Sequence, residues 1–142
     1  MPISISQSMM REIIMDHYSS PRHKTTPKNA AEYQQIHMDS TSCIDDIMVY
    51  IKVENGIVVD ACFDGVACTI ATASTDILCD LIIDKTTKEA NYILDQYENM
   101  IFEKEFDEET LDEALVFINT SKQAARIKCA TIGRNGIKEL IK

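Results

Sequence analysis

The sequence predicts an α+β fold in which a small antiparallel sheet of about three strands, built on a β-hairpin, packs against about five helices. Two stretches of alternating apolar and polar residues flank Asn55-Gly56, the apolar spacing changes to a helical one after Gly65, and capping-box sequences follow. The 142 residues are enough to enclose a sizeable core. We therefore expect residues 1–142 to form a single domain.

The first expected element is a helix that Pro21 ends. Ile5, Met9 and Ile13 recur at intervals of four residues, which places them on one face of a helix. The stretch from Pro21 to Ser42 is polar and has few apolar anchors, so we expect a loop there.

The hairpin is the clearest local feature. Asn55-Gly56 is a strong signal for a two-residue type I′ turn, which needs positive φ at both central positions. The alternating apolar residues of the two strands are Ile47, Val49, Ile51 and Val53, followed by Ile57, Val59, Ala61 and Phe63.

Helices are expected beyond Gly65. A broad apolar face predicts a helix over about 70–82, and Thr86 with Glu89 forms a capping box for a helix over about 87–100. The acidic stretch 102–109 is expected to be a loop.

Two more helices are expected near the C-terminus. Thr110 and Glu113 form a second capping box, which predicts a helix to about Asn119. A last helix is expected over about 129–141, although Gly133 and Gly136 weaken it by roughly 1 kcal/mol each relative to alanine.

Composition excludes several classes of function. The net charge is −9, which argues against sequence-independent nucleic-acid binding because that needs lysine and arginine to displace counterions. No run of about 18 apolar residues predicts a membrane span. The first basic residue is Arg11, so no secretory signal is expected, and five cysteines are then more consistent with reduced thiols in the cytoplasm than with disulfides.

Three cysteines and an aspartate are the candidate site: Cys43, Asp45, Cys68 and Cys129. Three thiols and a carboxylate suit a zinc-like ion. In extended chain Cys43 and Asp45 point the same way, Cys68 lies where the sheet gives way to a helix, and Cys129 is expected to open the last helix. No Cys-x-x-Cys knuckle is present, so the spacing alone leaves open that these are ordinary buried thiols.

The remaining cysteines and His17 serve as comparisons. Cys62 lies on a hairpin strand in register with Asp60 and Asp64, so it is expected to be a structural residue of the sheet. Cys79 follows Cys68 by 11 residues, or about 16 Å along a helix, which is too far for the two to bind one metal ion, so Cys79 is also expected to be structural. His17 ends the first helix, where a cation is favourable.

At these residues the chain resembles the SufU/IscU (NifU N-terminal-like) family of iron–sulfur cluster assembly proteins. Residues 16–22 resemble the opening Asp-His-Tyr-x-x-Pro-Arg segment, Cys43-Ile44-Asp45 resembles Cys-Gly-Asp, and residues 63–68 resemble Phe-x-Gly-x-Gly-Cys. Residues 125–131 resemble the third cysteine motif. Ile44 and Ala67 replace family glycines, so the first loop is expected to be shaped differently.

Three features are similar to the SufU branch. Sixty residues separate Cys68 from Cys129, and Lys128 stands where IscU-type scaffolds carry histidine. The Leu-Pro-Pro-Val-Lys segment of those scaffolds is absent.

The resemblance implies a zinc-dependent sulfurtransferase that accepts persulfide sulfur from a SufS-type cysteine desulfurase and serves downstream cluster scaffolds or apo-proteins. It implies Cys43, Asp45, Cys68 and Cys129 as the zinc ligands, with Cys43 as the sulfur acceptor. The alternative is a scaffold that assembles a [2Fe–2S] cluster on the same residues.

Overall fold

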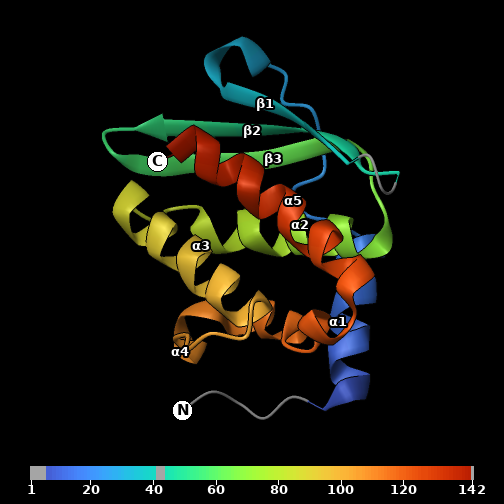
Figure 1. Cartoon of the computed structure of the whole chain (residues 1–142). Helices are drawn as coiled ribbons and strands as arrows, with labels where there is room; N and C mark the ends of the chain where they lie inside the picture. Colours follow the sequence, from blue (N-terminus) through green and yellow to red (C-terminus); the bar gives the residue numbers. More distant parts are fainter. Residues whose placement is uncertain (1–5, 41–43, 142) are drawn as a thin grey trace.

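The computed structural model describes residues 6–40 and 44–141, and Figure 1 shows a three-stranded sheet with helices gathered on one side of it. The α-helices and strands, in chain order, are α1 (Gln7–Ser19), β1 (Gln34–Asp39), β2 (Asp46–Glu54), β3 (Ile57–Val66), α2 (Thr69–Ile82), α3 (Thr87–Ile101), α4 (Glu108–Leu111) and α5 (Ala124–Ile141). Short 3₁₀ turns occupy η1 (Ala30–Glu32), η2 (Asp112–Phe117) and η3 (Thr120–Lys122). The expected α+β fold is therefore confirmed.

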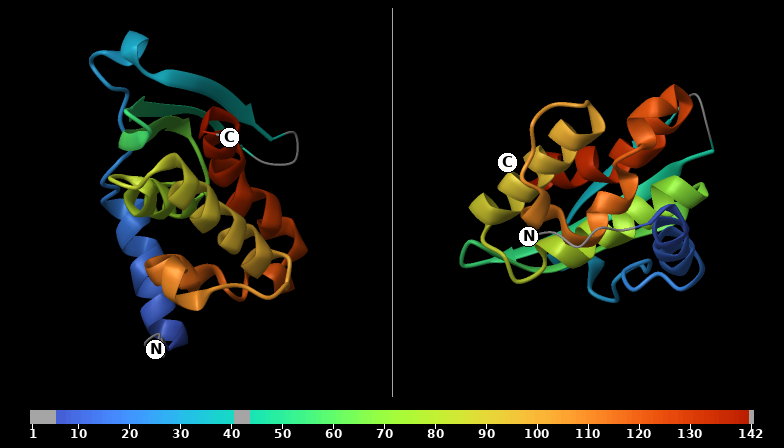
Figure 2. Two further views of the ribbon diagram at one scale, coloured as in Figure 1. Left: turned by 90° about the vertical axis from the view of Figure 1, so that its left-hand side faces the viewer. Right: turned by 90° about the horizontal axis from the view of Figure 1, so that it is seen from below.

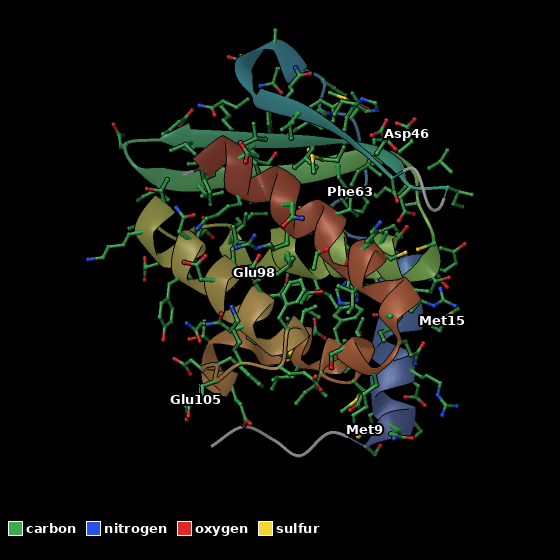
Figure 3. The ribbon with its side chains drawn as sticks, viewed as in Figure 1. Met9, Met15, Asp46, Phe63, Glu98 and Glu105 are labelled. Carbon is green, nitrogen blue, oxygen red and sulfur yellow. The ribbon has the colours of Figure 1, made fainter. Side chains whose placement is uncertain are left out.

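The sheet is antiparallel, in the order β1-β2-β3. Asn55 and Gly56 have φ values of 52° and 76°, so the predicted turn of the β2–β3 hairpin is confirmed. Val49 pairs with Phe63, and the apolar side chains of this face are fully buried. Figure 3 labels Phe63 at this junction of sheet and helices.

Three helices, α2, α3 and α5, cover this face of the sheet (Figures 1 and 2). Ten of the 14 residues of α2 are buried, which makes it the central helix of the described structure. It contacts α1 on one flank and α5 on another. A residue on α2 therefore influences several elements at once.

The expectation of an unbroken loop between Pro21 and Ser42 was wrong, because β1 lies within it. Gln34, Gln35, His37 and Asp39 make this edge strand largely polar and exposed. Its apolar side consists of Ile36 and Met38, which face α5. Two apolar residues are too few to produce a clear strand pattern.

The two capping boxes had different outcomes. At α3 the Thr86 hydroxyl accepts the Glu89 amide, and the Glu89 carboxylate accepts the Thr86 amide, each at 3.1 Å, so this box is confirmed. The box predicted at Thr110 was wrong, because α4 already begins at Glu108 and η2 follows it. Glu113 instead contacts His17, a partner far away in the sequence.

The last helix begins at Ala124, five residues before the position expected. Cys129 consequently lies in the second turn of α5 and does not open the helix. None of the helices in the described ranges is both long and apolar enough to cross a bilayer.

Candidate metal centre

The register of the hairpin brings Asp45 beside Cys68. Asp46 pairs with Val66, so the residues just outside that pair, Asp45 and Ala67, also lie next to each other. The Cys68 amide donates a 2.8 Å hydrogen bond to Asp45 Oδ1. Only 1% of Asp45 is exposed, so its carboxylate is held inside the protein at the start of β2.

Gly65 permits this close approach of the strands. Its φ of +128° is a conformation that residues with a side chain rarely adopt. A Cβ atom at this position would lie 2.3 Å from the Asp46 carbonyl oxygen. The glycine thus shapes the chain immediately before Cys68.

Cys68 is the N-cap of α2, as the sequence predicted for the end of the sheet. Its Sγ accepts the Ala71 amide at 3.4 Å and lies 3.9 Å from Asp45 Oδ2. One carboxylate oxygen of Asp45 is therefore tethered to the backbone, while the other faces the thiol.

Cys129 completes a group of three from the buried side of α5. One ligand atom each from Asp45, Cys68 and Cys129 lies within 4.8 Å of the others, and they form the one metal-ligand group of this kind found in the described part of the chain. The fourth candidate, Cys43, lies outside the described residues. The structure thus brings together the three candidates that it describes.

The three described donors, two thiols and a carboxylate, are of the kinds that zinc binds at three of its four tetrahedral positions. Zn–S bonds of about 2.3 Å and Zn–O bonds of about 2.1 Å place sulfur and oxygen ligands about 3.6 Å apart. The 3.9 Å between Cys68 Sγ and Asp45 Oδ2 differs from this by a few tenths of an ångström. Two soft thiolates with a harder carboxylate suit zinc or iron better than magnesium or calcium.

The surface beside this group is apolar and basic. Ile44 and Val66, which flank Asp45 and Cys68 in sequence, are 65% and 60% exposed. A groove of about 600 Å³ lies between α1, the start of α2, the η2–η3 segment and the start of α5, and both Arg11 and Arg126 line it. Met15 is also exposed on α1 (Figure 3).

Cys62 and Cys79 are outside the group, as expected. Burial, with help from the charges of Asp60 and Asp64, raises the pKa of the Cys62 thiol to about 12. Burial also raises the pKa of Cys79 well above its usual range. Both thiols are therefore protonated at neutral pH.

These pKa values predict slow alkylation of Cys62 and Cys79. At pH 8 fewer than about one in a thousand Cys62 thiols would be ionised, since each pH unit below the pKa lowers the thiolate fraction tenfold. Iodoacetamide labelling of the folded protein, followed by peptide mass spectrometry, should leave both residues almost unmodified. Labelling in urea is the control, and rapid modification of either residue without urea would contradict the prediction.

His17 has a larger structural role than the helix-dipole interpretation gave it. It is 2% exposed, and its Nδ1 lies 2.6 Å from Asp76 Oδ2 while its Nε2 lies 3.0 Å from Glu113 Oε1. Asp76 also accepts the His23 amide at 2.7 Å. No local pattern could have predicted these partners, because they lie 59 and 96 residues away.

Comparison with known proteins identifies the family to which this fold and residue group belong. Residues 9–129 match the NifU-like N terminal domain. The chain belongs to the NifU-like N-terminal domain family. The family resemblance predicted from the sequence is thereby confirmed, and with it membership of the iron–sulfur cluster assembly scaffold proteins of the IscU/SufU type.

The relatives of this NifU-like chain include both cluster assembly scaffold proteins and a zinc-dependent sulfurtransferase. It is 29% identical to the iron–sulfur cluster assembly scaffold protein IscU of Thermotoga maritima, with 97% of this chain and 96% of the relative covered. It is 31% identical to the zinc-dependent sulfurtransferase SufU of Bacillus subtilis, with 93% and 88% covered. The crystal structure of FiSufU from Fervidobacterium islandicum AW-1 is 30% identical and superposes with a TM-score of 0.84 over 92% of this chain and 95% of that one.

Proposed function

We propose that this protein is a zinc-dependent sulfurtransferase that accepts persulfide sulfur from a SufS-type cysteine desulfurase for iron–sulfur cluster assembly. The observation that carries the proposal is the convergence of Asp45, Cys68 and Cys129 from three elements to within 4.8 Å. Cys43 is proposed as the fourth ligand and as the sulfur acceptor. The similarity to Bacillus subtilis SufU supports this choice within the family.

Zinc suits this role because it is redox-inert and holds cysteine ligands as thiolates. In the proposed site Cys68 and Cys129 would supply sulfur ligands, and Asp45 would supply Oδ2, since its Oδ1 accepts the Cys68 amide. The carboxylate is the harder donor among soft ones, which favours an arrangement that can open.

The proposed transfer step is a thiol exchange at the terminal sulfur of the desulfurase persulfide. The Cys43 thiolate attacks that sulfur, a new S–S bond forms, and the bond to the desulfurase cysteine breaks. The desulfurase sulfur leaves as a thiolate with the bonding electron pair. No external oxidant or reductant is needed, because the persulfide oxidation level passes from one cysteine to the other.

The exposed surface beside the site supports delivery from a protein partner. Ile44 and Val66 offer apolar contact next to the proposed ligands, and Arg11 and Arg126 offer positive charge in a chain of net charge −9. After transfer, a cluster scaffold or an apo-protein would be the receiver of the sulfur.

A desulfurase assay tests the proposal. Metal-replete protein should raise cysteine turnover of the partner enzyme at least about tenfold, while Cys43→Ala should give no stimulation and carry no persulfide, because the acceptor thiol is missing. Alanine production and persulfide mass would be measured for replete, metal-stripped and Cys43→Ala protein.

Cys62→Ala is the matched control and should stimulate fully, because Cys62 lies outside the group. If metal-replete wild-type protein leaves the cysteine turnover of the desulfurase unchanged, the sulfurtransferase proposal is refuted. If metal removal then only lowered stability, a structural zinc site would explain the ligand group.

The second candidate is a scaffold that assembles a [2Fe–2S] cluster on the same residues. The similarity to Thermotoga maritima IscU over nearly the whole chain favours it. It predicts iron and acid-labile sulfide after anaerobic reconstitution, followed by transfer to an apo-ferredoxin. Zinc-loaded protein that stimulates the desulfurase but retains no cluster would decide against it.

A further inference from the structure

The helices α2 and α5 each carry one proposed thiol ligand and one residue of their mutual contact. Thr75 follows Cys68 by seven residues, and Gly133 follows Cys129 by four. Both spacings return to the same face of a helix. The face of α2 that presents Cys68 therefore also presents Thr75, and the face of α5 that presents Cys129 also presents Gly133. Figure 1 shows α5 passing across α2.

Thr75 and Gly133 meet without spare room. A Cβ atom on Gly133 would lie 2.1 Å from Thr75 Oγ1 and 2.7 Å from both Thr75 Cβ and Cγ2. Thr75 is fully buried, and its hydroxyl donates a 2.7 Å hydrogen bond to the Ala71 carbonyl. Rotating the threonine would not relieve the clash, because its own Cβ, fixed to the backbone, is among the atoms that are too close.

We infer that Thr75 and Gly133 are positioning residues that set the separation of the Cys68 and Cys129 thiols. This inference rests on the proposed metal site. Carbon atoms pack at about 3.5–4.0 Å, so relieving a 2.7 Å approach moves the helices apart by roughly 1 Å. Metal–ligand distances tolerate only about 0.2 Å. A methyl group that touches neither ligand would thus weaken the site.

Gly136 provides a matched comparison on the same helix. A Cβ atom there would meet Met38 Cγ at 2.9 Å and Val49 Cγ2 at 3.1 Å, which are side-chain atoms on the sheet. The flexible methionine belongs to the exposed edge strand β1 and can move aside, whereas the fully buried Val49 has to shift by only a few tenths of an ångström. Gly136→Ala brings the same gain in helix propensity as Gly133→Ala but does not press on α2.

The test compares Gly133→Ala, Gly136→Ala and the double variant Thr75→Gly/Gly133→Ala. Zinc affinity is measured by competition with a chromophoric chelator, and folding by far-UV circular dichroism. We expect Gly133→Ala to bind zinc about 10–100-fold more weakly, Gly136→Ala to stay within about threefold of wild type, and the double variant to recover most of the loss. Wild-type affinity in Gly133→Ala, or a folded double variant that recovers nothing, overturns the inference.

A metal-free measurement separates this inference from the proposed function. In a Cys43→Ser background, a short bifunctional thiol reagent should cross-link Cys68 to Cys129, and Gly133→Ala should lower the yield. Failure of wild-type protein to bind zinc would refute the proposed metal site, whereas unchanged cross-linking in Gly133→Ala would refute the positioning role. If Gly133→Ala does not fold, the double variant decides: restored cross-linking supports the contact, and absent cross-linking in folded protein overturns it.

Discussion

Cys68→Ser should remove zinc binding while leaving the fold intact. Serine is a preferred N-cap residue, so its hydroxyl can replace the thiol as the acceptor for the Ala71 amide at the start of α2. A neutral hydroxyl is a poor substitute for a thiolate ligand. The affinity for zinc should therefore fall by more than about 100-fold. Changing a residue that only hydrogen-bonds to a ligand usually has a smaller effect. Zinc content after purification and chelator competition would measure the loss.

Two variants sharpen this result. Cys62→Ala removes a thiol outside the group and should retain zinc at the wild-type level. Asp46→Asn alters the exposed neighbour of Asp45 and should also retain it, because Asp46 points its carboxylate toward His37. Folded Cys68→Ser protein that still holds zinc tightly would show that Cys68 is not a ligand.

His17→Ala should lower the free energy of unfolding by about 3 kcal/mol. The substitution leaves the Asp76 carboxylate, which is fully buried, without its closest side-chain partner, and it removes the hydrogen bonds that link α1 to α2 and to η2 through this side chain. Urea denaturation followed by circular dichroism would measure the change.

His37→Ala is the control for burial. The His37–Asp46 pair has the same 2.6 Å separation, but both side chains are more than half exposed. Solvent screens such a pair, so its loss should hardly change the free energy of unfolding. If His17→Ala changed the free energy of unfolding as little as His37→Ala is expected to, the buried network of His17 would not stabilise the protein.

The sequence predicted the elements whose signals are local. The Asn55-Gly56 turn depends on backbone conformations that few residues adopt, and the capping box of Thr86 and Glu89 spans one helical turn. Both elements could be predicted from the few residues that form them.

The failures occurred where distant contacts override local pattern. The strand β1 pairs with β2 and also packs Ile36 and Met38 near Gly136, which lies about 100 residues away. At the predicted capping box, Thr110 lies inside α4 and its hydroxyl donates to Asp107, while Glu113 contacts the distant His17. A single sequence contains both residues of each pair but does not indicate that they meet.

The sequence predicted which residues belong to the candidate site but not how they are arranged in space. Its residues could be singled out from motifs, yet their meeting depends on the β2–β3 register and on the crossing of α2 with α5. The second role of Asp45, as acceptor for the Cys68 amide, could not have been inferred from spacing.

That hydrogen bond also makes the site preorganised. It joins two proposed donors through the backbone and requires no ion, so the conformational entropy of Asp45 and Cys68 is lost when the chain folds and not when metal arrives. An ion captured at the proposed site would therefore meet two donors whose backbone positions are already fixed relative to each other, which lowers the entropic cost of its capture.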